Sequence, residues 1–93
     1  MITFDNWYYV YLLSSQTTNW IYIGCTSDLR KRLEEHKEGK VFSTKKMLPV
    51  ELIYYEAYRF KENAFEREKK LKQYGSSLAR LKKRVLIKEG RAG

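Results

Sequence analysis

Two runs of aromatic and β-branched residues near the start of the chain constrain its fold most. The first extends from Trp7 to Leu13 and the second from Trp20 to Cys25, and six polar residues separate them. Residues of these types favour strands, and two such runs joined by a short polar connection predict a β-hairpin. Because side chains alternate along a strand, Tyr9 and Tyr11 share one face of the first strand, and a face bearing Tyr22 on the second can adjoin it.

The rest of the chain predicts three helices and one further strand. Ser27 or Asp28 can cap the start of the first helix, and Gly39 can close its end. The predicted elements after the hairpin are a helix at about residues 28–38, a loop at 40–49, a strand at 50–58, a helix at 61–74 and a basic helix from about 76 to 88. The order β-β-α-β-α-α predicts an α+β fold, in which helices cover a small mixed sheet of three strands.

Length and the content of cysteine and histidine limit the architecture further. The 93 residues make one domain, with a core expected at about residues 7–87 and a short flexible tail at 88–93. The single Cys25 excludes an internal disulfide, and together with the single His36 it cannot form a structural zinc site. No stretch has the length of a membrane span or of a secretory signal. We therefore expect a cytoplasmic protein without membrane contact, acting as a monomer.

The chain is strongly basic, and its charge is unevenly distributed. Nineteen Lys and Arg residues against eleven Asp and Glu leave a formal net charge of +8. Residues 1–60 hold eight basic and seven acidic residues, whereas residues 61–93 hold eleven and four. A basic chain favours a polyanionic partner, with nucleic acid ahead of an acidic membrane. The alternative is that the charge only maintains solubility.

Glu68 is the most informative single position. In the predicted helix at 61–74 it lies on the same stripe as Ala64, Phe65 and Leu71, which are apolar. A carboxylate on such a stripe costs free energy unless a cation or hydrogen-bond donors compensate it. One interpretation is a boundary salt bridge with a neighbouring Lys or Arg. The other is a ligand for a divalent cation such as Mg²⁺, which can bind through one carboxylate, water and substrate phosphate.

Arg32 and His36 are candidates for contacting a phosphate. They are four residues apart, so they share a face of the predicted first helix and look toward the sheet. Arginine offers a planar fork of donors, and histidine can donate a hydrogen bond or carry a proton. A solvated helix edge would show the same spacing. Likewise, the tyrosines of the hairpin are explained equally by strand packing.

Together these residues resemble the GIY-YIG nuclease family. Tyr9-Val10-Tyr11 and Tyr22-Ile23-Gly24 look like the two halves of its motif, with ten residues between Tyr11 and Tyr22. Arg32 follows Tyr22 by ten residues, and His36 lies one turn further along a helix similar to the family's arginine helix. The third strand and the glutamate helix follow in order, so the resemblance covers about residues 7–87. It is closest to the small standalone bacterial members, which are related to the incision domain of nucleotide-excision repair.

The resemblance implies a three-stranded sheet flanked by helices and a divalent-metal-dependent endonuclease. Tyr11 would act as the general base toward the attacking water, and Arg32 would stabilise charge on the phosphate oxygens. Glu68 would hold one Mg²⁺ or Mn²⁺ ion, while Tyr22 and His36 would position water, phosphate or Tyr11. The expected substrate is DNA ahead of RNA, selected by strand structure, in DNA repair or processing.

The expected contacts with nucleic acid extend beyond these five residues, to Tyr9, Lys31, Lys45, Lys46, Lys72, Arg80, Lys83 and Arg84. Three positions depart from the family pattern. Tyr9 replaces the first glycine of the motif, Cys25 stands where repair relatives often have lysine, and Lys70 stands where many active relatives carry asparagine. A catalytically weak or inactive nucleic-acid-binding module of the same fold is therefore a second hypothesis, and a small adaptor for a protein partner is a third.

Overall fold

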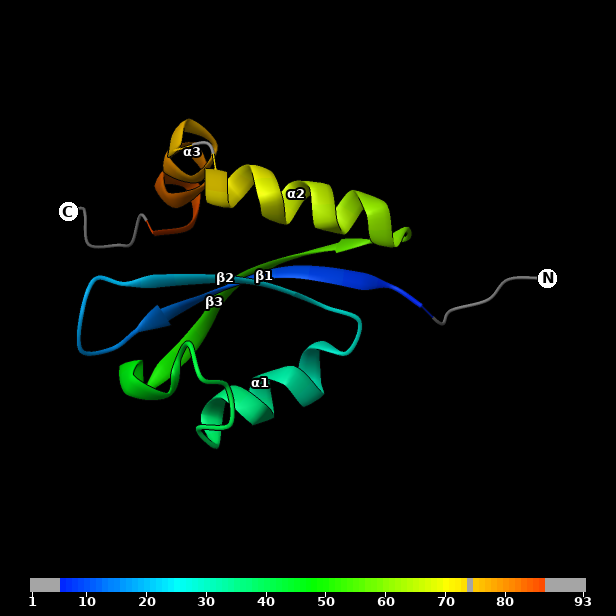
Figure 1. Cartoon of the computed structure of the whole chain (residues 1–93). Coiled ribbons are helices and arrows are strands. Elements are labelled where there is room, and N and C mark those ends of the chain that lie inside the picture. The colour runs from blue at the N-terminus through cyan, green and yellow to red at the C-terminus, as the bar shows by residue number, and fades with distance from the viewer. Residues whose placement is uncertain (1–5, 74, 87–93) are drawn as a thin grey trace.

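The computed structural model describes residues 6–73 and 75–86, which form one three-stranded sheet flanked by helices (Figure 1). Strands β1 (Tyr8–Ser15) and β2 (Ile21–Thr26) form the predicted hairpin. Strand β3 (Val50–Tyr58) pairs with the other side of β1, so the strand order is β2-β1-β3. The α+β class and the order β-β-α-β-α-α are confirmed.

The expectation of a mixed sheet is wrong, because both pairs of strands are antiparallel. After β2, helix α1 (Leu29–Lys37) carries the chain back along the sheet, so that β3 runs in the same direction as β2. These two strands do not pair with one another, since β1 lies between them. The central strand is therefore also the first one in the sequence.

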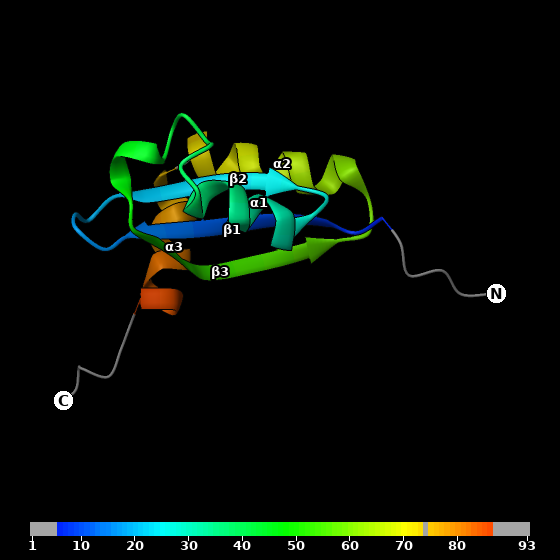
Figure 2. The same ribbon diagram turned by 90° about the horizontal axis from the view of Figure 1, so that it is seen from below.

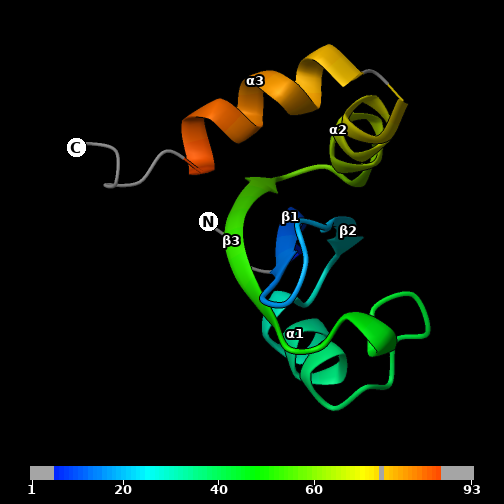
Figure 3. The same ribbon diagram turned by 90° about the vertical axis from the view of Figure 1, so that its left-hand side faces the viewer.

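The helices divide between the two faces of the sheet. Helix α1 lies on one face, and α2 (Lys61–Gln73) and α3 (Gly75–Leu86) lie on the opposite face (Figures 1 and 3). Figure 2 shows the same division from the α1 side, with α1 in front of the sheet and the other two helices behind it. Within the described parts of the chain, no helix has the length and apolarity that a membrane crossing requires.

The ends of α1 follow the sequence signals closely. The Asp28 carboxylate accepts a hydrogen bond from the backbone N–H of Lys31 at 3.1 Å, which satisfies one of the free donors at the helix start. Gly39 follows the helix with a φ of 76°, a left-handed conformation that glycine adopts without strain. Of the two predicted caps, Asp28 is therefore the one that is used.

The segment at 40–49 is not wholly irregular, because it contains a short 3-10 helix, η1 (Lys45–Met47). The predicted helix end at Tyr74, the helix end near Lys88 and the tail at 88–93 lie outside the described residues.

The hydrophobic core lies between the sheet and the pair α2 and α3. Its buried members are Val10, Leu12, Ile23, Ala64, Leu71 and Leu81. The prediction that Phe65 belongs to the inner stripe of α2 is wrong, since that residue is 51% exposed. Its neighbour Ala64 already faces the sheet, and the next position on a helix is rotated by about 100° away from it. The Lys61 ammonium group lies 5.6 Å from the centre of the Phe65 ring.

Candidate active site

A chain of three hydrogen-bonded side chains lies between the sheet and α1. The hydroxyl oxygen of Tyr11, on β1, is 2.8 Å from Nε2 of His36, on α1. The other ring nitrogen, Nδ1, is 2.8 Å from Oγ1 of Thr44, in the loop that follows the helix. All three residues are almost completely buried. The β-hairpin, α1 and the loop after it therefore meet at the His36 ring.

The proton positions in this chain follow from the Thr44 hydroxyl. That group lies within 3.4 Å of the carbonyl oxygen of Val41, to which it donates. Its single proton is then used, so its oxygen accepts from Nδ1–H of His36. On this basis we assign the proton of the neutral ring to Nδ1, so that Nε2 accepts from the Tyr11 hydroxyl. The proton of Tyr11 points toward a base.

Aromatic contacts and one glycine surround Tyr11. The ring centres of Tyr11 and Tyr22 are 6.2 Å apart, and those of Tyr22 and His36 are 5.1 Å apart. Gly24 pairs with Tyr11 across the hairpin, and a Cβ atom there would lie 2.5 Å from its Cζ and hydroxyl oxygen. The glycine at the end of the second motif triplet is therefore required by the position of the Tyr11 ring.

Arg32 lies at the solvent side of this cluster. One of its guanidinium nitrogens is 2.9 Å from a carboxylate oxygen of Glu35, and the Arg32 side chain is 38% exposed. The arrangement fixes the guanidinium group beside Tyr11 while part of its donor fork still faces solvent. Arg32 can therefore reach both the tyrosine and a ligand.

Burial and charge set the protonation of Tyr11 and His36. Burial raises the pKa of Tyr11 well above its ordinary range, neighbouring Tyr22 adds to the rise, and Arg32 opposes it. Burial also lowers the pKa of His36, the positive charge of Arg32 adds to that effect, and Glu35 opposes it. Both groups are therefore neutral at neutral pH.

Glu68 lies on α2, on the opposite face of the sheet from α1. Its carboxylate is 2.9 Å from the ammonium nitrogen of Lys72 one turn later, and the Glu68 side chain is 22% exposed. Cys25, on the edge strand β2, lies near residues on both faces of the sheet. Burial raises the pKa of the Cys25 thiol, Glu68 adds to the rise, and Lys72 opposes it, which places both α2 side chains near the thiol.

The same cysteine lines a solvent-open cleft of about 300 Å³ on the α1 side, together with Lys31, Arg32 and Glu35. The edge strand β2 thus separates Glu68 from Arg32. Four of the five predicted catalytic residues, Tyr11, Tyr22, Arg32 and His36, come together in one cluster. Glu68 approaches the same edge of the sheet from the other face.

Glu68 alone offers a single carboxylate to a hard divalent ion, and its described neighbours, Lys72 and Cys25, add no oxygen ligand. The carboxylate supplies the oxygen ligand that Mg²⁺ and Mn²⁺ accept. Among residues 6–73 and 75–86, no group of three or more His, Cys, Asp or Glu side chains is placed to hold an ion. An ion bound at Glu68 would therefore complete its shell with water and a substrate phosphate, as Mg²⁺ commonly does.

The predicted nucleic-acid contacts do not form one surface. Lys31 lines the cleft beside Arg32, while Lys45 and Lys46 are exposed on η1. Tyr9 is half-buried, with its ring centre 6.0 Å from that of Tyr55 on β3. The remaining four, Lys72, Arg80, Lys83 and Arg84, belong to α2 and α3 on the far face of the sheet.

Two residues of this cluster, Thr44 and Glu35, are not among those predicted from the sequence. Thr44 lies in a segment without periodicity, and only the turn at Gly39 brings it back to His36. Glu35 lies three residues after Arg32, a spacing at which helical side chains meet, and that spacing is a usable signal.

Comparison with known proteins identifies one family that this chain resembles. The family model described as "GIY-YIG catalytic domain" matches residues 7–83. UPF0213 protein YazA of Bacillus subtilis (strain 168) is 37% identical over 87 residues, covering 92% of this chain and 83% of the relative. A UPF0213 protein of Staphylococcus aureus (strain Mu3) is 36% identical over 83 residues, covering 88% and 95%. One from Haloquadratum walsbyi is 31% identical over 87 residues, covering 92% of each chain.

No solved structure matches the chain. The family match nevertheless includes the hairpin, α1, β3 and α2, and with them all five predicted catalytic residues. Such a domain implies nuclease-type activity and binding of nucleic acid. The resemblance seen in the sequence is confirmed, and the chain belongs to the GIY-YIG family.

Proposed function

We propose that this chain hydrolyses phosphodiester bonds of DNA with the help of one bound Mg²⁺ or Mn²⁺ ion. The observation that carries the proposal is the 2.8 Å contact between the Tyr11 hydroxyl and Nε2 of His36, the ring nitrogen to which we assign no proton. A hydroxyl that donates to a base can accept a proton from a third group at the same time. Tyr11 is therefore placed to relay a proton rather than only to pack.

We assign to Tyr11 the role of accepting a proton from the attacking water. Because the pKa of Tyr11 is raised, the free phenolate is scarce at neutral pH. Transfer of the Tyr11 proton to Nε2 as the water proton arrives avoids that phenolate. His36 then carries the positive charge only during the step, and Thr44 keeps its ring in the tautomer that the transfer needs.

We assign to Arg32 the role of binding the phosphate that is cleaved. Its guanidinium can stabilise negative charge that develops on the nonbridging oxygens as water adds to phosphorus. The bond from phosphorus to the 3′ oxygen then breaks, and this oxygen takes a proton from solvent water, which leaves a 5′ phosphate on one strand end and a 3′ hydroxyl on the other. Glu35 holds Arg32 in place at 2.9 Å.

Glu68 is the residue that would hold the ion. When bound, a divalent ion supplies positive charge beside the phosphate and the leaving 3′ oxygen. Lys72 pairs with the same carboxylate, but its side chain is 52% exposed and pairs of this kind contribute little stability. The carboxylate can therefore exchange the ammonium group for a metal ion.

The choice of DNA, the repair context and the cytoplasmic monomer belong to the proposal as well. Residues 6–73 and 75–86 form one three-stranded sheet with its helices, and this described part of the chain holds no second unit to read base sequence. Selection by strand structure, as at branches and flaps, is therefore the form of specificity that we assign, in DNA repair or processing.

A second candidate function is a nucleic-acid-binding module with little or no hydrolysis. Two observations favour it. Tyr11 is only 1% exposed, which restricts the access of water. The Glu68 carboxylate is already paired with Lys72 at 2.9 Å.

A cleavage panel separates the two. Branched, flapped, duplex and single-stranded DNA, with RNA of the same sequences, are incubated with the protein in Mg²⁺, Mn²⁺ or EDTA. We expect metal-dependent nicking of DNA near branches, with a loss of about 100-fold or more in Glu68→Gln. Glu66→Gln, an exposed position on the same helix, is the matched control and should cleave normally. Binding without cleavage under every condition would instead establish the second function.

A further inference from the structure

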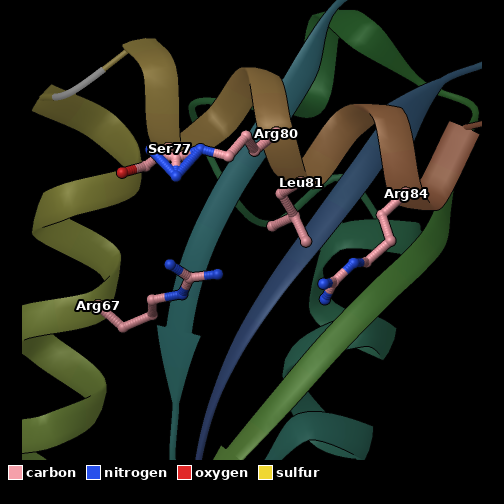
Figure 4. A pocket seen from close by; sticks show the side chains of 5 residues that line it. All are labelled: Arg67, Ser77, Arg80, Leu81 and Arg84. Carbon is pink, nitrogen blue, oxygen red and sulfur yellow. The ribbon is translucent and has the colours of Figure 1, made fainter.

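A cavity of about 200 Å³ lies between α2 and α3, away from the Tyr11 cluster, and three arginines line it. Its lining residues are Arg67, Ser77, Arg80, Leu81 and Arg84. Figure 4 shows Arg67 projecting from α2 and Arg84 from α3 into the same space, while Arg80 extends along α3 toward Ser77. We call this the arginine cavity.

Arg67 is fixed by a network on β3. Its guanidinium donates two hydrogen bonds of 2.9 Å and one of 3.2 Å to the Glu56 carboxylate. The hydroxyl groups of Tyr54 and Tyr58 donate to the same carboxylate. Burial alone would raise the pKa of Glu56, but Arg67 and the two tyrosines outweigh it and lower that pKa. Glu56 therefore stays charged and neutralises Arg67.

Arg80 and Arg84 have no such partner. Within residues 6–73 and 75–86, no carboxylate forms a salt bridge with either guanidinium group. Both residues are exposed on α3, and Arg84 is close enough to Tyr54 to oppose the rise in its pKa. The arginine cavity consequently carries about two uncompensated positive charges, and only one acidic side chain, Glu56, belongs to its framework.

This combination suits a phosphate group. Guanidinium forks pair with phosphate oxygens through two parallel hydrogen bonds, and two forks can share one phosphate. Ser77 adds a hydroxyl donor at the rim of the cavity. The Glu56 network stabilises Arg67 before any ligand arrives, which reduces the ordering cost of binding.

We propose that the arginine cavity binds a phosphate group of a nucleic-acid strand, at a site separate from the candidate active site. The cavity is lined by residues of α2 and α3, which lie on the opposite face of the sheet from α1 (Figure 3), and its Arg67 pairs with Glu56 on the edge strand β3. The cleft beside Arg32 is lined by Cys25 of the other edge strand, β2. A nucleic acid that occupies both places must pass around the sheet or branch. The inference rests on the proposed function only for the identity of the polymer.

Binding is measured in EDTA, where no metal-dependent cleavage occurs. The result therefore tests the phosphate site whether or not the protein is an active nuclease. Fluorescence anisotropy measures the affinity for a labelled four-way junction and for a duplex over a range of salt concentrations. The test variant is Arg80→Gln/Arg84→Gln, and the control is Lys69→Gln/Lys70→Gln, which removes the same charge from exposed positions of α2. Melting temperatures of all variants confirm that they are folded.

We expect the arginine variant to bind the junction about ten- to a hundredfold more weakly than the wild type. The slope of log affinity against log salt concentration should also be smaller by about two, because two phosphate contacts are lost. The lysine control should keep nearly the full salt dependence. Arg80→Lys/Arg84→Lys should fall between them, because it retains charge but not the donor fork. Unchanged affinity in the arginine variant, or an equal loss in both glutamine variants, would overturn the proposal.

Competition experiments and an NMR titration then identify the kind of ligand that the cavity binds. Competition by a DNA strand that greatly exceeds competition by the same concentration of inorganic phosphate supports a nucleic-acid phosphate. If inorganic phosphate shifts the arginine side-chain NMR signals while the glutamine variant keeps its DNA affinity, the cavity is a free-phosphate site and the proposal is wrong. Equal competition by polyglutamate would likewise contradict it, since it would indicate a site for acidic peptides.

Discussion

The Cβ position of Gly24 lies 2.5 Å from the hydroxyl oxygen of Tyr11, closer than any carbon side chain can come without displacing the ring. Gly24→Ala should therefore move Tyr11 and destabilise the fold by about 1–3 kcal/mol, the usual cost of overpacking. Chemical denaturation measures the loss. Gly75→Ala is the control, because nothing lies within 4 Å of its Cβ position, and it should leave stability nearly unchanged. Equal stability of the two variants would contradict the packing described.

Thr44→Val tests the hydrogen-bond chain. The substitution preserves shape but removes the oxygen that accepts from Nδ1–H of His36, so a buried donor is left unpaired. We expect a loss of about 1–3 kcal/mol. The ¹⁵N shifts of the ring should also show a larger share of the Nε2–H tautomer. His36 is the only histidine in the chain, so its signals need no assignment. A tautomer ratio equal to that of the wild type would show that Thr44 does not set it.

The protonation of His36 predicts how stability depends on pH. Burial and Arg32 lower its pKa in the folded state below the ordinary value of about 6.5. The unfolded chain therefore binds a proton more readily, and stability falls as pH decreases from about 6.5 toward the lowered pKa. An NMR titration of the single histidine should give a midpoint below 6.5. A midpoint at or above that value would contradict the effect of burial and Arg32 on His36.

Glu56→Gln tests the framework of the arginine cavity. The carboxylate is paired with Arg67 at 2.9 Å, and its side chain is only 15% exposed. Removing its charge leaves Arg67 uncompensated, so we expect a loss of about 3 kcal/mol in the free energy of unfolding. Burial and the bond to Glu56 raise the pKa of Tyr58 to about 12, and this pKa should fall in the variant. Glu66→Gln, exposed on α2, serves as the comparison and should leave both quantities unchanged.

The fold and four residues of the cluster could be predicted because local signals and tertiary contacts agree there. Alternation in the two runs placed Tyr11 and Tyr22 on adjoining faces, and helical spacing placed Arg32 and His36 toward the sheet. The capping residues Asp28 and Gly39 likewise act locally, so the sequence alone indicates them. Such features depend on residues only a few positions apart.

Contacts between distant segments could not be predicted in this way. Thr44 reaches His36 only because the loop after α1 folds back, and no periodicity signals that. Glu56 and Arg67 belong to different elements, so neither residue indicates its partner. Phe65 is apolar and therefore expected inside, but Ala64 takes the buried position and Phe65, the next residue on the helix, is 51% exposed. The sheet is wholly antiparallel because β3 pairs with β1 and not with β2, and residue types do not specify that choice of partner.

The central claim is that Tyr11 relays a proton from water to His36. Its most direct test is the single-turnover rate of cleavage of a branched DNA in saturating Mg²⁺ by the wild type and by Tyr11→Phe. We expect the variant to be slower by about 100-fold or more, since general-base steps contribute about that much. Tyr55→Phe, the same change on the residue that faces Tyr11 across β1 and β3, should cleave at the wild-type rate. Equal rates for the wild type and Tyr11→Phe would contradict the account.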